Sequence, residues 1–231
     1  HLRIEIAARR LGKNQFFTTT TATEAKARRD LAADADKLRR TGYDPARIEN
    51  LHTAVIKALC GFLFNCPLDM VIERDLHARF PVLRPSQYLS VRLMADEALR
   101  ANTTPEILKI SPRKILRASL AMNGAYCLFL DDLFEGASAF AAPYRRLDNF
   151  DMAKRLYRHW TDRSAVLEEG TEYVLVDEFA DLLGLRDWYE WQPDPGEHEV
   201  ADTTREGASN PALLHTLHPA AVWYLLGALR R

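Results

Sequence analysis

The feature that most constrains the fold is a polar residue followed by proline at four points of the chain. In this arrangement the polar side chain caps the first turn of a helix, and proline fits the next position because its missing N–H is not needed there. The four pairs are Asp44-Pro45, Thr104-Pro105, Ser111-Pro112 and Asn210-Pro211. They predict helix starts spread along 231 residues, so the sequence favours an all-α fold.

Apolar residues at helical spacing support this fold class. After the first proline, one stripe along about five turns of helix is formed by Ile48, Leu51, Val55, Leu59 and Phe62. Further helices are expected over residues 2–11, 22–40, 86–101, 113–134, 149–160 and 173–183. Residues 173–176 could instead form a short strand, but Gly184 is a suitable helix stop and favours helix. We predict a single multi-helix domain of about eight helices, with its core centred on 45–63 and 113–134.

The composition changes towards the end of the chain. Residues 192–210 are rich in Pro, Gly, Asp, Glu, Thr and Ser and hold almost no large apolar residue, which predicts a surface loop or linker. A peripheral C-terminal helix is expected within 211–231, packed on a core domain of residues 1–191.

Charge and cysteine usage bear on partners and compartment. The chain has 31 Lys plus Arg against 32 Asp plus Glu, which gives no general attraction to nucleic acid or an anionic membrane. No uninterrupted apolar run approaches the roughly 18 residues that cross a bilayer, so neither partner is expected.

The three cysteines, Cys60, Cys66 and Cys127, are odd in number, lie in apolar surroundings and form no Cys-x-x-Cys pair. They favour reduced thiols and, with no visible secretory signal, a cytoplasmic protein.

Two carboxylates stand in an otherwise apolar stretch. Asp69 and Glu73 are four residues apart and therefore share one face of a helix. Their neighbours are Phe64, Leu68, Met70, Val71 and Ile72. Burying ionised carboxylates there requires a metal ion, an arginine or another cation. Ion pairs with Arg74, Arg79 or an arginine of another helix are therefore the alternative to a metal site.

His1 and Glu5 form a second pair one helical turn apart. An imidazole and a carboxylate at this spacing can face one divalent ion, and zinc accepts nitrogen and oxygen ligands. An exposed pair without function is the alternative. Because the chain begins with His1 and both ends fall inside helical patterns, we expect it to be a piece of a longer protein.

The order of these segments resembles a known group of proteins. The run His1-Leu-Arg-Ile-Glu-Ile-Ala-Ala-Arg-Arg-Leu-Gly is followed by a polar helix and then by Asn65-Cys-Pro-Leu-Asp-Met-Val-Ile-Glu. This order is similar to that of uncharacterised bacterial zincin-like metallopeptidases, over about the first 135 residues and loosely beyond. In such proteins an HExxH helix supplies two zinc-binding histidines and a general-base glutamate, and a downstream helix supplies an acidic ligand. The resemblance implies that His1 is the second histidine of HExxH.

The resemblance also implies a zinc cofactor and a peptide or protein substrate. Asp69 would be the third ligand and Glu73 the second choice, with Glu5 nearby and Asn65 orienting a ligand from behind. The first histidine and the catalytic glutamate would precede His1, so this chain would hold metal ligands but no catalytic residue and would not hydrolyse peptides by itself. The alternative function is a non-catalytic helical interaction or scaffold module, in which the two acids of the downstream helix form buried ion pairs.

Two other groups attract attention in the sequence. His215 and His218 have a spacing compatible with a metal, but Pro219 interrupts the helix there and two surface histidines are the simpler interpretation. An aromatic cluster precedes the predicted linker and consists of Trp188, Tyr189 and Trp191. It is expected to anchor the linker to the core, with a peptide-binding platform as the alternative.

Overall fold

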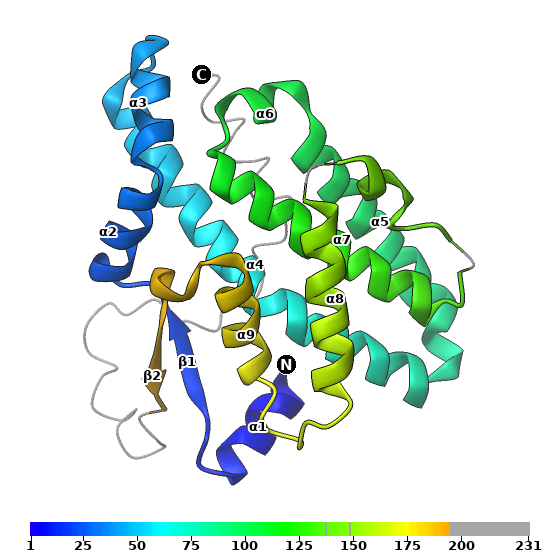
Figure 1. Ribbon diagram of the computed structural model, residues 1–231. Helices are drawn as coiled ribbons and strands as arrows, with labels where there is room; N and C mark the ends of the chain where they lie inside the picture. The colour runs from blue at the N-terminus through cyan, green and yellow to red at the C-terminus, as the bar shows by residue number, and fades with distance from the viewer. Residues whose placement is uncertain (137, 148, 195–231) are drawn as a thin grey trace.

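A computed structural model describes residues 1–136, 138–147 and 149–194 (Figure 1). In this part of the chain, nine α-helices accompany one two-stranded sheet, which confirms the all-α fold class and the estimate of about eight helices. The predicted linker from residue 195 onward, the C-terminal helix within 211–231 and the pair His215 and His218 lie outside the described residues.

The helices are α1 (Leu2–Arg10), α2 (Thr21–Asp30), α3 (Ala32–Arg40), α4 (Pro45–Arg79), α5 (Arg84–Thr103), α6 (Pro105–Ile110), α7 (Arg113–Leu133), α8 (Phe150–Ser164) and α9 (Val174–Leu183). Short 3-10 turns are η1 (Pro81–Leu83), η2 (Ala142–Arg146) and η3 (Arg186–Trp188). The strands are β1 (Gln15–Thr18) and β2 (Glu190–Pro193).

Helix α4 crosses the whole molecule (Figure 1). It begins as the sequence predicts, because the Asp44 carboxylate accepts a hydrogen bond of 3.0 Å from the Arg47 backbone N–H. It then continues for 35 residues, well past the five turns predicted, and contains Pro67 in its interior. Pro67 has no N–H to donate within the helix. It is buried, and its backbone carbonyl accepts a hydrogen bond of 3.0 Å from the Trp160 indole N–H. The apolar stripe and the acidic segment therefore belong to one helix.

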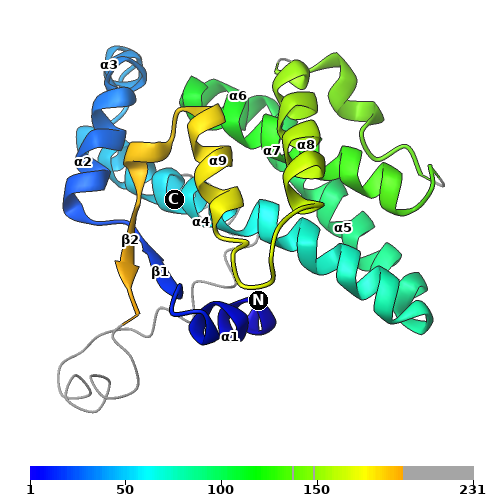
Figure 2. The same ribbon diagram turned by 60° about the horizontal axis from the view of Figure 1, so that its bottom comes forward.

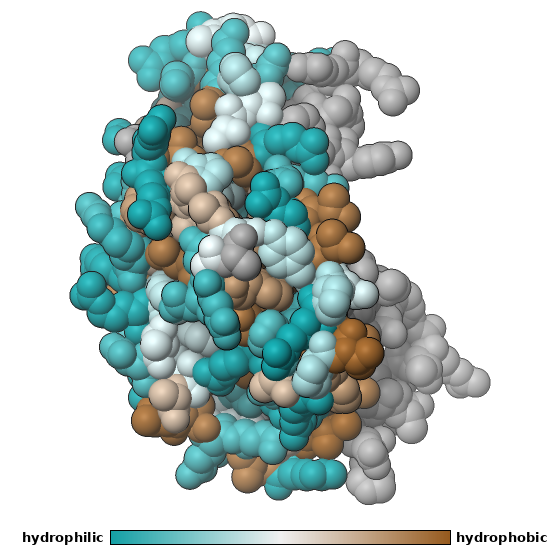
Figure 3. All heavy atoms as spheres, turned by 90° about the vertical axis from the view of Figure 1, so that its right-hand side faces the viewer, coloured by the Kyte–Doolittle hydropathy of each residue, from teal (hydrophilic) through white to brown (hydrophobic). Residues whose placement is uncertain are grey.

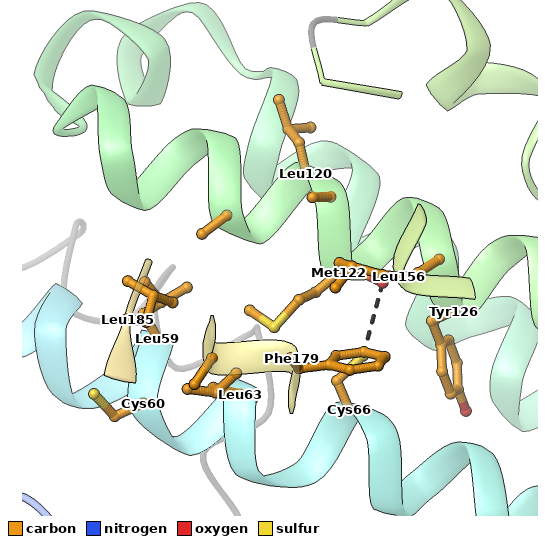
Figure 4. Close-up of a cluster of buried hydrophobic side chains, with 14 of the residues drawn as sticks. Leu59, Cys60, Leu63, Cys66, Leu120, Met122, Tyr126, Leu156, Phe179 and Leu185 are labelled. Atoms are coloured by element: carbon orange, nitrogen blue, oxygen red, sulfur yellow. Dashed lines mark hydrogen bonds between the residues drawn. The ribbon is translucent and has the colours of Figure 1, made fainter. Parts of the chain in front are cut away.

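The core lies between α4 and α7, as predicted. Figure 4 shows Leu63 and Cys66 of α4 on the side of the helix towards α7, and the Cys66 thiol contacts the Met122 backbone carbonyl of α7 at 3.7 Å. The cysteines Cys60, Cys66 and Cys127 are free and buried, which confirms the prediction of core thiols. Burial raises the pKa of Cys60 and that of Cys127 to about 12, so both stay protonated at neutral pH.

By length and composition, α4 is also a helix that could cross a membrane, although its sequence is not an uninterrupted apolar run. Its most apolar window is 56% buried inside the protein. Burial of this kind is what a central core helix shows, since its apolar surface is covered by α7, α9 and their neighbours.

The helix predicted over 22–40 is wrong in one respect, because the structure divides it at Leu31 into α2 and α3. Leu31 is fully buried. The preceding Asp30 carboxylate accepts 3.0 Å from the Trp188 indole N–H and 2.5 Å from the Lys114 ammonium. These distant contacts bend the chain despite a composition that suits one continuous helix.

The sheet was not predicted. Strands β1 and β2 are antiparallel, with Phe17 opposite Trp191, and they join the two ends of the described chain. Strand β2 takes up residues 192 and 193, which the composition had assigned to the start of the surface loop. Figure 2 shows the sheet beside α1, with α1 lying along the same side of α4.

Exposed apolar side chains occur around the turn from α4 to α5. They are Phe80, Val82, Leu83, Leu89 and Leu93. Figure 3 shows this side of the molecule as mainly hydrophilic, with apolar residues in small separate groups. Scattered exposure of this kind is ordinary for a protein surface.

Candidate metal centre

A polar stripe runs along α4 in the middle of an apolar helix. It consists of Asn65, Asp69, Glu73 and His77, each one helical turn after the last. All four side chains are half-buried. The sequence had nominated the first three, and the fourth continues the same spacing.

His1 meets this stripe at its second member. The His1 Nε2 atom lies 3.0 Å from Asp69 Oδ1, and the side chains are 31% and 35% exposed. The imidazole also stacks on Phe64, with ring centroids 6.1 Å apart and an interplanar angle of 18°. The backbone carbonyl of His1 accepts 3.0 Å from the Glu5 N–H, so His1 already follows the helical register of α1.

Helix α1 is fixed against α4 by contacts on either side of this pair. Ile4 is buried at 2% exposure, and Arg3 forms an ion pair with Asp75 of α4. The backbone of α1 also touches Gly170, in the loop between α8 and α9. His1 is therefore positioned by packing on two sides and not only by its own partner.

Glu73 has a different partner. The Gln87 amide nitrogen, on α5, donates 2.6 Å to Glu73 Oε2 and 2.8 Å to the Glu73 backbone carbonyl. Burial raises the pKa of Glu73 and the nearby Asp69 raises it further, while the hydrogen bond from Gln87 lowers it. The charge of Asp69 therefore affects the pKa of Glu73. The two acids nevertheless have different hydrogen-bonding partners, His1 for Asp69 and Gln87 for Glu73.

The other nominated residues are placed as follows. The Glu5 carboxylate forms an ion pair of 3.0 Å with Arg9 one turn later on α1. The Asn65 Oδ1 atom is buried and has no hydrogen-bond partner among the described residues. No hydrogen bond between Asn65 and a candidate ligand is present in the described part of the chain, so its orienting role stays a prediction.

Tyr126 is a neighbour that the sequence did not single out. Its side chain points from α7 towards α4 (Figure 4). Tyr126 is 9% exposed, and its hydroxyl has no hydrogen-bond partner within the described residues. Burial raises the pKa of Tyr126 well above the ordinary value, and the charges of Glu73 and Asp69 raise it further, so the hydroxyl stays protonated. The only sequence signal was its place in the helix predicted to be central.

An aromatic group supports the imidazole from behind. Phe64 contacts Phe17, Tyr173 and Trp191, with ring centroids 5.3, 6.1 and 6.2 Å away. Trp188 and Tyr189 are only 1% and 2% exposed and belong to the core. Most of the linker that they were predicted to anchor lies outside the described residues. The aromatic cluster therefore has a packing role, and its member Trp191 contacts Phe64, on which the His1 ring stacks.

The chemistry and spacing of the first pair suit a shared ion. Two zinc bonds of about 2.0–2.1 Å at a tetrahedral angle hold their ligand atoms about 3.3 Å apart, close to the 3.0 Å between His1 Nε2 and Asp69 Oδ1. Among the described residues, no group of three or more His, Cys, Asp and Glu is placed to hold a metal ion. The structure thus brings His1 and Asp69 together and leaves Glu73 and Glu5 with partners of their own.

The comparisons with known proteins give no further guidance: no family model matches the chain, and neither a curated protein nor a solved structure matches it significantly.

Proposed function

We propose that this chain is the C-terminal-side portion of a zinc-dependent metallopeptidase-like protein, in which His1 and Asp69 are two of the metal ligands. The observation that carries the proposal is the 3.0 Å contact between their side chains, which lie 68 residues apart in the sequence. A nitrogen and an oxygen donor meet there from two helices, beside a third acid, Glu73, one turn along α4.

The residues of the chain have distinct tasks in such a site. Zinc, when bound, polarises water for attack on the carbonyl of a peptide or protein substrate. His1 would offer Nε2 while Phe64 holds its ring, and Asp69 would offer Oδ1.

A working site also requires groups that are not in this chain. In the intact protein a histidine four residues before His1 would lie on the same face of an extended α1, and a glutamate three residues before His1 would act as the base. The sequence immediately upstream tests this directly: any tetrapeptide other than His-Glu-x-x would contradict the peptidase assignment. The chain alone should bind zinc weakly and hydrolyse nothing. Its three free, buried thiols support a reducing, cytoplasmic setting.

Zinc titration of the chain tests the metal site. Asp69→Asn should weaken zinc binding by at least about tenfold, because it removes a charged ligand and leaves an amide of the same shape. A matched control is Glu178→Gln, which alters a second histidine–carboxylate pair, His159 Nε2 to Glu178 Oε2 at 2.9 Å, where Arg163 also contacts the carboxylate. Equal zinc affinity in the wild type and Asp69→Asn would contradict the proposal.

The second candidate is a helical interaction or scaffold module without catalysis. It is favoured by the ion pair of Glu5 with Arg9 and by the hydrogen bond of Gln87 to Glu73, since both acids are then satisfied without a metal. In such a module the contact of His1 with Asp69 would only dock α1 on α4. Asp69→Asn would then lower the free energy of unfolding and leave zinc binding unchanged.

A further inference from the structure

A cleft of about 480 Å³ opens where the start of α7 meets α3, the N-terminus of α8 and the end of α9. Its polar lining consists of Asp34, Arg113, Lys114, Arg117 and Asn149, and the rest of its lining is apolar. A volume of this size lies in the range of small-molecule sites. None of the residues that line it belongs to the candidate metal centre.

The start of α7 places positive charges where a helix tolerates them least. Three of its first five residues are cations, Arg113, Lys114 and Arg117. In the described structure its first turn contains no acidic residue and no side-chain hydrogen bond caps it. A helix N-terminus already carries a partial positive charge, and like charges four residues apart repel each other. A sequence that breaks a local rule in this way is expected at a functional site, and a bound anion would offset both effects.

The two arginines of this group are available to a ligand. Lys114 already forms an ion pair of 2.5 Å with Asp30. Arg113 and Arg117 are exposed, and neither forms an ion pair with a residue that the structure describes. The one side-chain hydrogen bond of Arg117 there is a long one of 3.4 Å, donated to Asn149 Oδ1. Two guanidinium groups one turn apart match a phosphate monoester, which carries close to two negative charges at neutral pH and accepts paired hydrogen bonds from arginine.

The remainder of the cleft suits the rest of such a molecule. The half-buried side chains of Met152, Leu182 and Leu183 form an apolar wall, against which a flat or apolar group can pack. Asp34 of α3 is also half-buried, and its carboxylate has no hydrogen bond or ion pair with any described residue. An ionised carboxylate can only accept hydrogen bonds, so a hydroxyl group of the ligand is a suitable partner for it.

We propose that this cleft binds a nucleoside monophosphate. Its phosphate binds Arg113 and Arg117, a ribose hydroxyl donates to Asp34, and its base packs against the apolar wall. A free phosphate ion would leave the wall and the acid without a partner, whereas a nucleotide carries a group for each. The inference goes beyond the proposed metal centre and does not depend on it, because the two sites share no residue.

Isothermal titration calorimetry of the full 231-residue chain with AMP, GMP, CMP and UMP tests the proposal. At least one nucleotide should bind with a Kd below about 1 mM. It should bind about tenfold or more tightly than its own nucleoside, which lacks the phosphate, and than ribose 5-phosphate, which lacks the base. Failure of all four nucleotides to bind would overturn the proposal. Equal affinity for ribose 5-phosphate would overturn it too, because the apolar wall would then play no part.

Substitutions locate the bound nucleotide. Arg113→Gln and Arg117→Gln remove a charge and keep a long polar side chain, and each should weaken binding about tenfold. Arg100→Gln is the matched control, because Arg100 is an exposed arginine of α5 that does not line the cleft. If all three variants bind like the wild type, the nucleotide binds elsewhere and the assignment is wrong. Circular dichroism identifies a variant that fails to fold, and the other arginine variant of the cleft then decides.

Discussion

Gly170 lies so close to Ala7 that a Cβ atom at position 170 would come within 2.7 Å of the Ala7 carbonyl carbon. Gly170 also has a φ of +90°, in the left-handed region that favours glycine. The loop between α8 and α9 thus presses its backbone directly on α1, the helix that carries His1. A side chain at position 170 would have to push this helix away.

We therefore expect Gly170→Ala to lower the free energy of unfolding by about 2–5 kcal/mol, from backbone strain and overpacking together. Gly42→Ala is a matched control, because Gly42 also has a φ of +90° but a Cβ there would meet nothing within 4 Å. Gly42→Ala should lower the free energy of unfolding only by the cost of backbone strain, about 1–2 kcal/mol. Urea unfolding measures both values, and equal losses would show that the close approach to α1 carries no energy.

Tyr126→Phe should raise the free energy of unfolding by about 1 kcal/mol, because it removes a buried hydroxyl that no described residue satisfies. Tyr189→Phe makes the same change where the hydroxyl donates 2.5 Å to the Asp177 carboxylate, and it should lower stability by about 1–3 kcal/mol. Thermal or urea unfolding gives the sign of each change. Destabilisation by Tyr126→Phe would indicate that this hydroxyl already has a partner in solution.

Glu73→Gln should stabilise the metal-free chain at pH 7. The pKa of Glu73 is raised by burial and by Asp69, so the unfolded chain releases this proton at lower pH than the folded one. Stability is therefore lost as pH rises through the ordinary value of 4.5 towards the raised pKa, and the substitution removes this loss. The gain should disappear below about pH 4.5. Urea unfolding at several pH values tests the trend, and a gain independent of pH would contradict it.

His52 should make stability fall in mildly acidic solution. It is 3% exposed, and burial lowers its pKa, an effect that Asp34 opposes and that Arg28 and Arg39 reinforce. At mildly acidic pH, His52 therefore binds a proton more readily in the unfolded chain than in the folded one. The free energy of unfolding declines as pH drops below about 6.5. His52→Leu should flatten this slope, which is at most about 1.4 kcal/mol per pH unit for one proton. An unchanged slope in the variant would assign the effect to other groups.

The sequence predicted those parts of the fold that depend on local chemistry. Asp44 caps α4, and Gly184 takes the left-handed conformation that ends α9, with a φ of +66°, because each acts on its own helix. The division at Leu31 could not be predicted in the same way, since it depends on Trp188, which is distant in the sequence. Strand β1 is short and finds its partner only near the end of the described chain.

The candidate site was predictable to a similar extent. The spacing of Asp69 and Glu73 placed both on one helical face, and the resemblance nominated His1 beside them. Their assignment to partners could not be predicted: His1 reaches Asp69 because α1 is docked by the loop at Gly170, and Glu73 is held by Gln87 from a helix that follows a tight turn. Contacts of this kind depend on tertiary packing and leave no periodic signal.

The pairing of β1 with β2 has a consequence for how the protein is made. The Asn14 side-chain amide, just before β1, donates a hydrogen bond of 2.8 Å to the Asp194 carboxylate, just after β2. The two residues are 180 positions apart in the sequence. A ribosome must therefore release almost the whole described chain before β1 can find its partner and secure the adjoining α1. During synthesis α4 and α7 can pack together first, before the segment that carries His1 is fixed by the sheet. The candidate metal centre would be among the last features to form on a nascent chain.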